Sequence, residues 1–316
     1  MGSLILLLIS GAYVGWNIGS NDAGNCIGTS VGSGLIPYRR AIVLVGLFAV
    51  LGALLQGQAV IKTVGKGIVT AELPFLAIFA AMISAGLVVT LATFFKLPVS
   101  TSQAIVGGIA GVGIAVGAEV DLSKLVMIGE VWVICPFLTG LMAFILYHLL
   151  AVFLRRIRRP LLFDRSAKAL LIMSACYVSF SLGANNIGNS VGLLTNFGIQ
   201  SRWIALLGGG ALALGALTYG WKVTETVGSG IVPLDPLSAA CAQASAAIAG
   251  HFFAILGIPV SISQAVVGAV VGVGLVRGMR AIKRRRVLEI GVGWVATPTI
   301  AGLVSFGLYK VLSFFV

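Results

Sequence analysis

Two short polar clusters interrupt the apolar sequence, and each is a near copy of the other. The first is Gly-Ser-Asn-Asp-Ala-Gly-Asn at residues 19–25, and the second is Gly-Ala-Asn-Asn-Ile-Gly-Asn at residues 183–189. Polar groups without partners are costly in hydrocarbon, so neither cluster is expected to face lipid. Carboxylate and amide oxygens are the ligands that hard cations such as Na⁺ prefer. We therefore predict one sodium site shared by both clusters, with the ligands Asn21, Asp22, Asn25, Asn185 and Asn189.

A second motif also occurs twice, as Pro-Val-Ser-Thr-Ser-Gln at residues 98–103 and Pro-Val-Ser-Ile-Ser-Gln at residues 259–264. Proline suits a helix start, because the N–H that it lacks has no partner there. A helix N-terminus carries partial positive charge and binds anions. Two such starts predict a clamp that holds one oxyanion from both sides. The predicted anion ligands are Asp22, Thr101, Ser102, Gln103, Asn186, Ser263 and Gln264, and Ser100 and Ser261 join the predicted sodium ligands.

Both interpretations have a structural alternative. The serines and glutamines would then only cap helices or bond between them, the asparagines would only fasten helices, and Asp22 would be a neutral, hydrogen-bonded acid. Recurrence of both motifs at matching positions favours a shared site over these alternatives. One further pair stays open: Glu225 has Lys62 as its counterpart in the repeat, a change of sign that suits either opposite membrane faces or gating groups.

The composition indicates a polytopic α-helical membrane protein. Hydrophobic residues make up 59% of the 316 residues and charged residues only 9%. The net charge of +12 fits the positive-inside rule better than nucleic-acid binding, so no nucleic-acid partner is expected. The four cysteines stand alone in apolar runs, so neither a resident cofactor nor a disulfide is expected. Apolar runs suited to helices lie at residues 3–20, 41–61, 73–95, 125–154, 169–184, 203–221, 236–257 and 287–315.

The paired motifs recur in the same order at offsets of 164 to 161 residues, which indicates an internal duplication. We divide the chain into a first repeat at residues 1–154, a basic link at 155–168 and a second repeat at 169–316. Glycines flank each Asn/Asp cluster, so the helices are expected to break there. Residues 26–36 are too short to span comfortably, which predicts a half-helix or re-entrant segment.

The links between apolar runs predict the relative orientation of the repeats. Residues 119–124 are acidic, whereas the equivalent residues 277–286 and the central link are strongly basic. The positive-inside rule places the two basic links in the cytoplasm and the acidic link outside. Each repeat must then cross the membrane an odd number of times. The prediction is an all-α polytopic membrane protein made of two inverted-topology repeats with broken or re-entrant helices, about 10 to 12 spans, and both termini extracytoplasmic.

These residues resemble the inorganic phosphate transporter (PiT) family. The resemblance rests on the duplicated Asn/Asp signature, on Gly-Thr-Ser-Val-Gly at residues 28–32, and on the Pro-Val-Ser motifs, and it covers the whole chain. It implies symport of orthophosphate with Na⁺ or H⁺, sometimes as a metal–phosphate complex. Two departures matter. The family commonly has an acid where this chain has Asn186, which bears on ion stoichiometry, and the large insertion of many relatives is here only the short basic link.

We predict a sodium-coupled symporter of inorganic phosphate in the plasma membrane, not an enzyme. Its expected partners are phosphate, Na⁺ and the lipid bilayer, and a homodimer is a further expectation. A proton-coupled phosphate or metal–phosphate symporter is the first alternative, and an anion channel the second, because broken helices also line selectivity filters. An intramembrane hydrolase is disfavoured, since neither histidine falls in a motif and no nucleophile–base pairing is visible.

Overall fold

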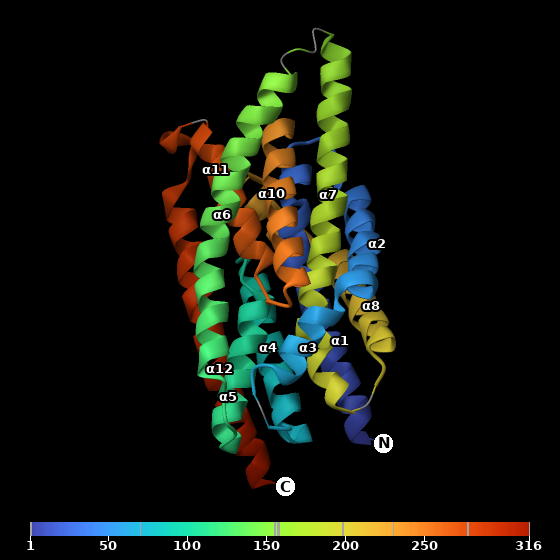
Figure 1. Cartoon of the computed structure of the whole chain (residues 1–316), viewed down its shortest axis with the longest axis vertical. Coiled ribbons are helices and arrows are strands. Elements are labelled where there is room, and N and C mark those ends of the chain that lie inside the picture. The colour runs from blue at the N-terminus through green and yellow to red at the C-terminus, as the bar shows by residue number, and fades with distance from the viewer. Residues whose placement is uncertain are drawn as a thin grey trace.

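Apolar runs fold into long helices from one end of the chain to the other (Figure 1). The computed structural model describes residues 2–69, 71–154, 156, 159–197, 199–229, 231–276 and 278–315. Three arginines of the predicted basic links, Arg155, Arg158 and Arg277, lie outside the described residues. The helices of the first repeat are α1 (Gly2–Gly32), α2 (Tyr38–Gln56), α3 (Gln58–Lys66), α4 (Phe75–Phe94), α5 (Thr101–Val116) and α6 (Leu122–Leu154). Those of the second are α7 (Pro160–Val191), η1 (Gly192–Phe197), α8 (Ser201–Tyr219), α9 (Trp221–Ser229), α10 (Pro236–Ile255), α11 (Ile262–Val276), η2 (Met279–Ala281) and α12 (Arg284–Phe314).

Eight of these helices are long and apolar enough to cross a membrane, which makes the chain a multi-pass membrane protein. Two further apolar helices in the described part of the chain, α5 and α11, are shorter, so the helices long enough to span number eight, fewer than the 10 to 12 spans that we expected. Most of the surface of α6 and α12 is exposed, and Phe137 and Val295 are examples, 75% and 73% exposed. Such surfaces suit contact with lipid.

Two helical hairpins enter the bundle from opposite ends (Figure 1). The α4–α5 hairpin rises from the end that holds both termini, and the α10–α11 hairpin descends from the other end. Their tips meet near mid-height, so the N-termini of α5 and α11 both begin inside the bundle. Re-entrant helices were expected in each repeat, and these hairpins, which carry the duplicated Pro-Val-Ser motifs, have that form. Each helix pair is joined by one short tip, residues 95–100 and 256–261.

The Asn/Asp clusters do not break their helices, contrary to our expectation. The first cluster lies inside α1, which runs unbroken for 31 residues, and the second lies inside α7, which runs for 32. The flanking glycines serve close packing instead. A Cβ on Gly19 would overlap the carbonyl oxygen of Leu212 on α8, and a Cβ on Gly183 would overlap that of Ala49 on α2. The expected half-helix at residues 26–36 is therefore wrong, because α1 continues through it to Gly32.

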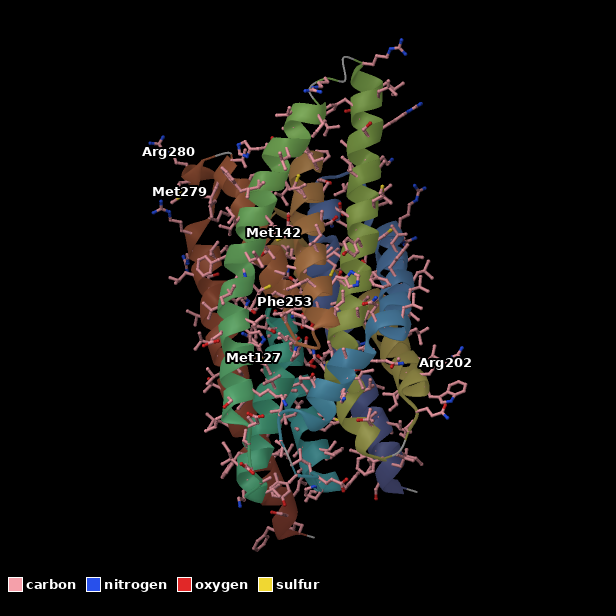
Figure 2. All side chains as sticks on the ribbon, viewed as in Figure 1. Met127, Met142, Arg202, Phe253, Met279 and Arg280 are labelled. Carbon is pink, nitrogen blue, oxygen red and sulfur yellow. The ribbon has the colours of Figure 1, made fainter. Side chains whose placement is uncertain are left out.

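The two repeats are inverted relative to each other. Helix α1 rises from the N-terminal end and its counterpart α7 descends, and α6 and α12 are likewise opposed (Figure 1). Both termini and the acidic link before α6 lie at one end. Arg280, in the basic link before α12, lies at the opposite end (Figure 2). The separation of acidic and basic links thus follows the predicted inversion.

Contacts between the repeats hold the hairpins in place. Helix α5 packs on α12 and α11 packs on α6, so each short helix is covered by the long last helix of the other repeat. Glycines permit this close packing: Gly107 packs against the backbone of Pro298, and Gly268 against that of Pro136. The hairpin tips are consequently positioned by both repeats.

Candidate functional site

The centre of the site is the carboxylate of Asp22 on α1. Its side chain is buried, and both carboxylate oxygens accept hydrogen bonds from the second repeat. Ser263 Oγ, at the start of α11, donates to Oδ1 at 2.8 Å, and Asn186 Nδ2, on α7, donates to Oδ2 at 2.7 Å. Two donors on two oxygens is the pattern that suits an ionised carboxylate. Asp22 therefore meets its own counterpart in the repeat, Asn186, in the middle of the bundle.

Asn25 and Asn189 reach across the repeat boundary in equivalent ways. Asn25 Nδ2 donates to Ser263 Oγ at 2.6 Å, and Asn189 Nδ2 donates to Ser102 Oγ at 2.7 Å. The two serines then differ, because only the first Asn/Asp cluster contains an acid. Ser263 donates to Asp22, whereas Ser102 donates to the carbonyl oxygen of Val260 at 2.9 Å. The Asn/Asp clusters and the Pro-Val-Ser motifs thus lie in contact, as predicted. The contacts are equivalent in the two repeats except that Ser263 donates to a carboxylate and Ser102 to a backbone carbonyl.

Asn21 and Asn185 bind the hairpin of their own repeat. Asn21 Nδ2 donates to the hydroxyl of Thr93 at 2.8 Å and to the carbonyl of Leu97 at 3.0 Å, and its Oδ1 accepts from the N–H of Val99 at 3.2 Å. In the second repeat, Asn185 bonds the carbonyls of residues 258 and 250 and the N–H of residue 260. These two amides anchor the hairpin tips. For Asn21 and Asn185 the contacts therefore match the structural alternative, in which the asparagines fasten helices together.

Ser100 and Ser261 are N-caps. Ser100 Oγ accepts from the N–H of Gln103 at 3.1 Å, and Ser261 Oγ accepts from the N–H of Gln264 at 3.1 Å. The helices begin one residue later, at Thr101 and Ile262, so the prolines lie in the tips two residues before the caps rather than at the helix starts. The remaining amides of each first turn have no partner within the helix and point out of its start.

Several buried polar atoms around this centre have no hydrogen-bond partner, although buried polar groups in folded proteins nearly always have one. The residues that carry them are at most 3% exposed. None of the six is a lysine, arginine or histidine, and five of the six atoms are amide oxygens, which bind cations well. The atoms are Asn25 Oδ1, Thr101 Oγ1, Gln103 Oε1, Asn186 Oδ1, Asn189 Oδ1 and Gln264 Oε1.

The arrangement can serve two kinds of ligand at once. Oxygen atoms and one carboxylate offer coordination to a small hard cation, and two helix N-termini with hydroxyl groups offer positive potential and donors to an anion. The pattern that defines the phosphate transporter family matches residues 18–163 and, a second time, residues 158–305. The chain belongs to the phosphate transporter family. This phosphate transporter is accordingly a transport protein and not an enzyme.

Individual relatives agree with the family assignment. A Methanocaldococcus jannaschii protein named as a candidate phosphate permease is 31% identical over 313 residues, covering 98% of each chain. The Arabidopsis thaliana protein named inorganic phosphate transporter 2-1, chloroplastic, is 26% identical, over 97% of this chain and 72% of its own. A solved structure named "The sodium-dependent phosphate transporter" superimposes with a TM-score of 0.92 at 26% identity and covers both chains completely.

Some residues that shape the site escaped the sequence motifs. Trp132 on α6 donates from Nε1 to the carbonyl of Pro259 at 3.0 Å and so fixes the second tip, whereas Nε1 of its counterpart Trp294 is buried without a partner. Thr93 supports Asn21 from the end of α4. Lys96 connects the first tip to the other repeat. Of these residues, Lys96 has a signal in the sequence, because it lies two positions before the first Pro-Val-Ser motif.

Proposed function

We propose that this phosphate transporter is a symporter that couples the movement of inorganic phosphate to Na⁺. The observation that carries the proposal is the buried carboxylate of Asp22, which accepts hydrogen bonds at both oxygens and lies among amide oxygens that have no partner. An ionised, buried acid requires a counter-charge, and a bound cation supplies one. The structural neighbour is named as a sodium-dependent protein, and this supports the choice of ion.

Phosphate would bind between the N-termini of α5 and α11. Neither Pro-Val-Ser motif contains a lysine or arginine, so backbone amides and helix dipoles would provide the attraction. Thr101, which has isoleucine as its counterpart, gives the first motif one more donor than the second. The proposed side-chain donors are Thr101, Ser102, Gln103, Ser263 and Gln264.

The sodium ligands that fit best are Asp22, Asn25 and Asn189, to which we add Asn186, a residue that the sequence assigned to the anion. Each of these three asparagines has a buried amide oxygen without a partner, and each lies within one hydrogen bond of Asp22 or of a site serine. Asn21, Asn185, Ser100 and Ser261 already hold the hairpin tips, and their direct ligation of sodium stays a prediction.

Coupling follows from charge. Phosphate carries more than one negative charge at neutral pH, and the charge of Asp22 opposes its binding while the cation site is empty. A bound sodium ion reverses that effect, so each ligand raises the affinity for the other, reciprocally. A proton on Asp22 would neutralise the charge too, and a protonated carboxyl can donate while both of its oxygens still accept, so the ion dependence of uptake must separate the two schemes.

Uptake into proteoliposomes tests the proposal. Reconstituted protein should accumulate radiolabelled phosphate when an inward Na⁺ gradient is imposed and should not do so when choline replaces Na⁺. Accumulation driven by a pH gradient without Na⁺ would establish the proton-coupled alternative. Flux that runs only downhill, with no dependence on either ion, would establish the channel.

The proposed orientation places both termini outside the plasma membrane and the basic links in the cytoplasm. The separation of acidic and basic links in the fold supports it. A cysteine introduced at Glu119 should react with a membrane-impermeant thiol reagent added to intact cells, and one at Arg284 should react only after permeabilisation. Equal labelling of both positions from one side would contradict the orientation.

A further inference from the structure

The tip of the first hairpin is tied to α9 of the other repeat by contacts outside the central site. Lys96 Nζ lies 3.2 Å from Glu225 Oε2, and Thr226 Oγ1 donates to the carbonyl oxygen of Lys96 at 3.0 Å. Lys222 Nζ lies 4.7 Å from the ring centroid of Phe94, at the end of α4. An ion pair, a hydrogen bond and a cation–π contact therefore join the two repeats at one place.

The backbone at Lys96 indicates that its side chain is used. Lys96 has a φ of 59°, and among the described residues it is the one position other than glycine with positive φ. Its counterpart in the second repeat is Gly257, with a φ of 71°. Glycine adopts this conformation at lower cost than a residue with a Cβ. A lysine at this position therefore carries backbone strain that a glycine would avoid. We infer that a contact made by the lysine side chain offsets this cost.

The equivalent place in the second hairpin has none of this chemistry. Gly257 lies so close to α3 that a Cβ would be 3.2 Å from both the carbonyl oxygen of Ala59 and Oγ1 of Thr63. The hydroxyl of Thr63 donates within its own helix, to Ala59, at 3.3 Å. In the equivalent contact, Lys62 of the first repeat replaces Glu225, and Gly257 of the second repeat replaces Lys96. This contact therefore has no acid to pair with Lys62 at the hairpin tip. The two hairpin tips thus meet the other repeat by tight packing on one side and by charge on the other.

We propose that Lys96 and Glu225, supported by Phe94, Lys222 and Thr226, form a one-sided latch between the repeats that must open during transport. The inference rests on the proposed function, because inverted repeats that exchange access move their hairpins relative to the opposite repeat. The side chains of Lys96 and Glu225 are 50% and 66% exposed, so the ion pair can separate without either charge becoming buried inside the protein. The latch makes the two access states unequal, in favour of the one in which the pair is closed.

Charge reversal combined with hydrogen exchange tests the latch. We would compare the wild type with Lys96→Glu, Glu225→Lys and the double reversal. Each single change should speed amide exchange in residues 94–100 and 221–229 by about two- to five-fold, the population change that an exposed ion pair produces. The counterpart segments 255–261 and 58–66 should not change. The double reversal should restore wild-type exchange, and high choline chloride should shift the wild type toward the single variants.

A control is the pair Arg285–Glu289, a contact within α12 at 3.1 Å, in which Glu289 also contacts Arg286 at 2.9 Å. Its reversal should leave exchange at the latch unaltered. Where a reversed variant fails to fold, Lys96→Met and Glu225→Gln keep the test available. Unchanged exchange in the folded single variants, or a double reversal as fast as the two singles combined, would overturn the latch. Absence of phosphate uptake by the wild type would instead overturn the proposed function, so the two failures are distinguishable.

Discussion

Replacing Asp22 by asparagine is the sharpest test of the proposed coupling. The change removes one negative charge and nearly preserves shape. It also leaves the local hydrogen bonds repairable, because Asn186 Oδ1 has no partner now and a turn of that amide brings it to the new N–H. Ser263 can keep donating to the remaining oxygen. We expect the variant to fold, with a free energy of unfolding lowered by about 1 kcal/mol.

The effect on sodium should be far larger than the effect on folding. A unit charge about 4 Å from a bound ion contributes ~4 kcal/mol at an effective dielectric constant of 20. Removing it should weaken sodium binding roughly a thousandfold, since each 1.4 kcal/mol is about a factor of ten. In the variant no carboxylate repels phosphate. Weak phosphate binding should therefore remain, with an affinity that does not depend on the sodium concentration.

The assay is phosphate affinity measured across a sodium titration, in detergent, for the wild type and Asp22→Asn. Wild-type affinity should rise steeply with sodium, and the variant should give a flat response. The double variant Asp22→Asn with Asn186→Asp moves the acid to the equivalent position on α7 and should recover part of the sodium response. A wild-type response in the single variant would refute the role of Asp22 and favour a coupling residue elsewhere.

Three further predictions address the anion clamp and the scaffold. Gln103→Ala and Gln264→Ala should each weaken phosphate binding by roughly 1–3 kcal/mol, measured by isothermal titration, and unchanged affinity in either would exclude a two-sided clamp. Asn185→Ala removes the anchor of the second tip and should lower stability by ~1–2 kcal/mol in a thermal unfolding assay, with faster proteolysis near residue 258. Gly19→Ala should destabilise by about 1–3 kcal/mol because its Cβ would overlap the backbone of α8, whereas Gly129→Ala, at a position with open space around it, should be neutral.

Sequence alone was enough to predict the class of protein, the duplication and the inverted orientation. Those properties depend on composition, on repeated motifs and on the charge of the links, all of which are visible without knowing which helices touch. The central position of the Ser-x-Ser-Gln helix starts also followed from their recurrence. The carboxylate of Asp22 and the hydroxyl of Ser263 do meet, 2.8 Å apart, across 241 positions of sequence.

Tertiary structure decided what the polar and small residues do. The glycines at positions 19 and 183 predicted broken helices, but a missing Cβ permits a bend and a close helix crossing equally well, and only the neighbours α8 and α2 select the second. Asn21 and Asn25 lie one turn apart on α1, yet the first binds its own hairpin and the second binds Ser263 of the other repeat. Residues one turn apart on one helix meet different partners, and those partners are set by helix packing that no local pattern encodes.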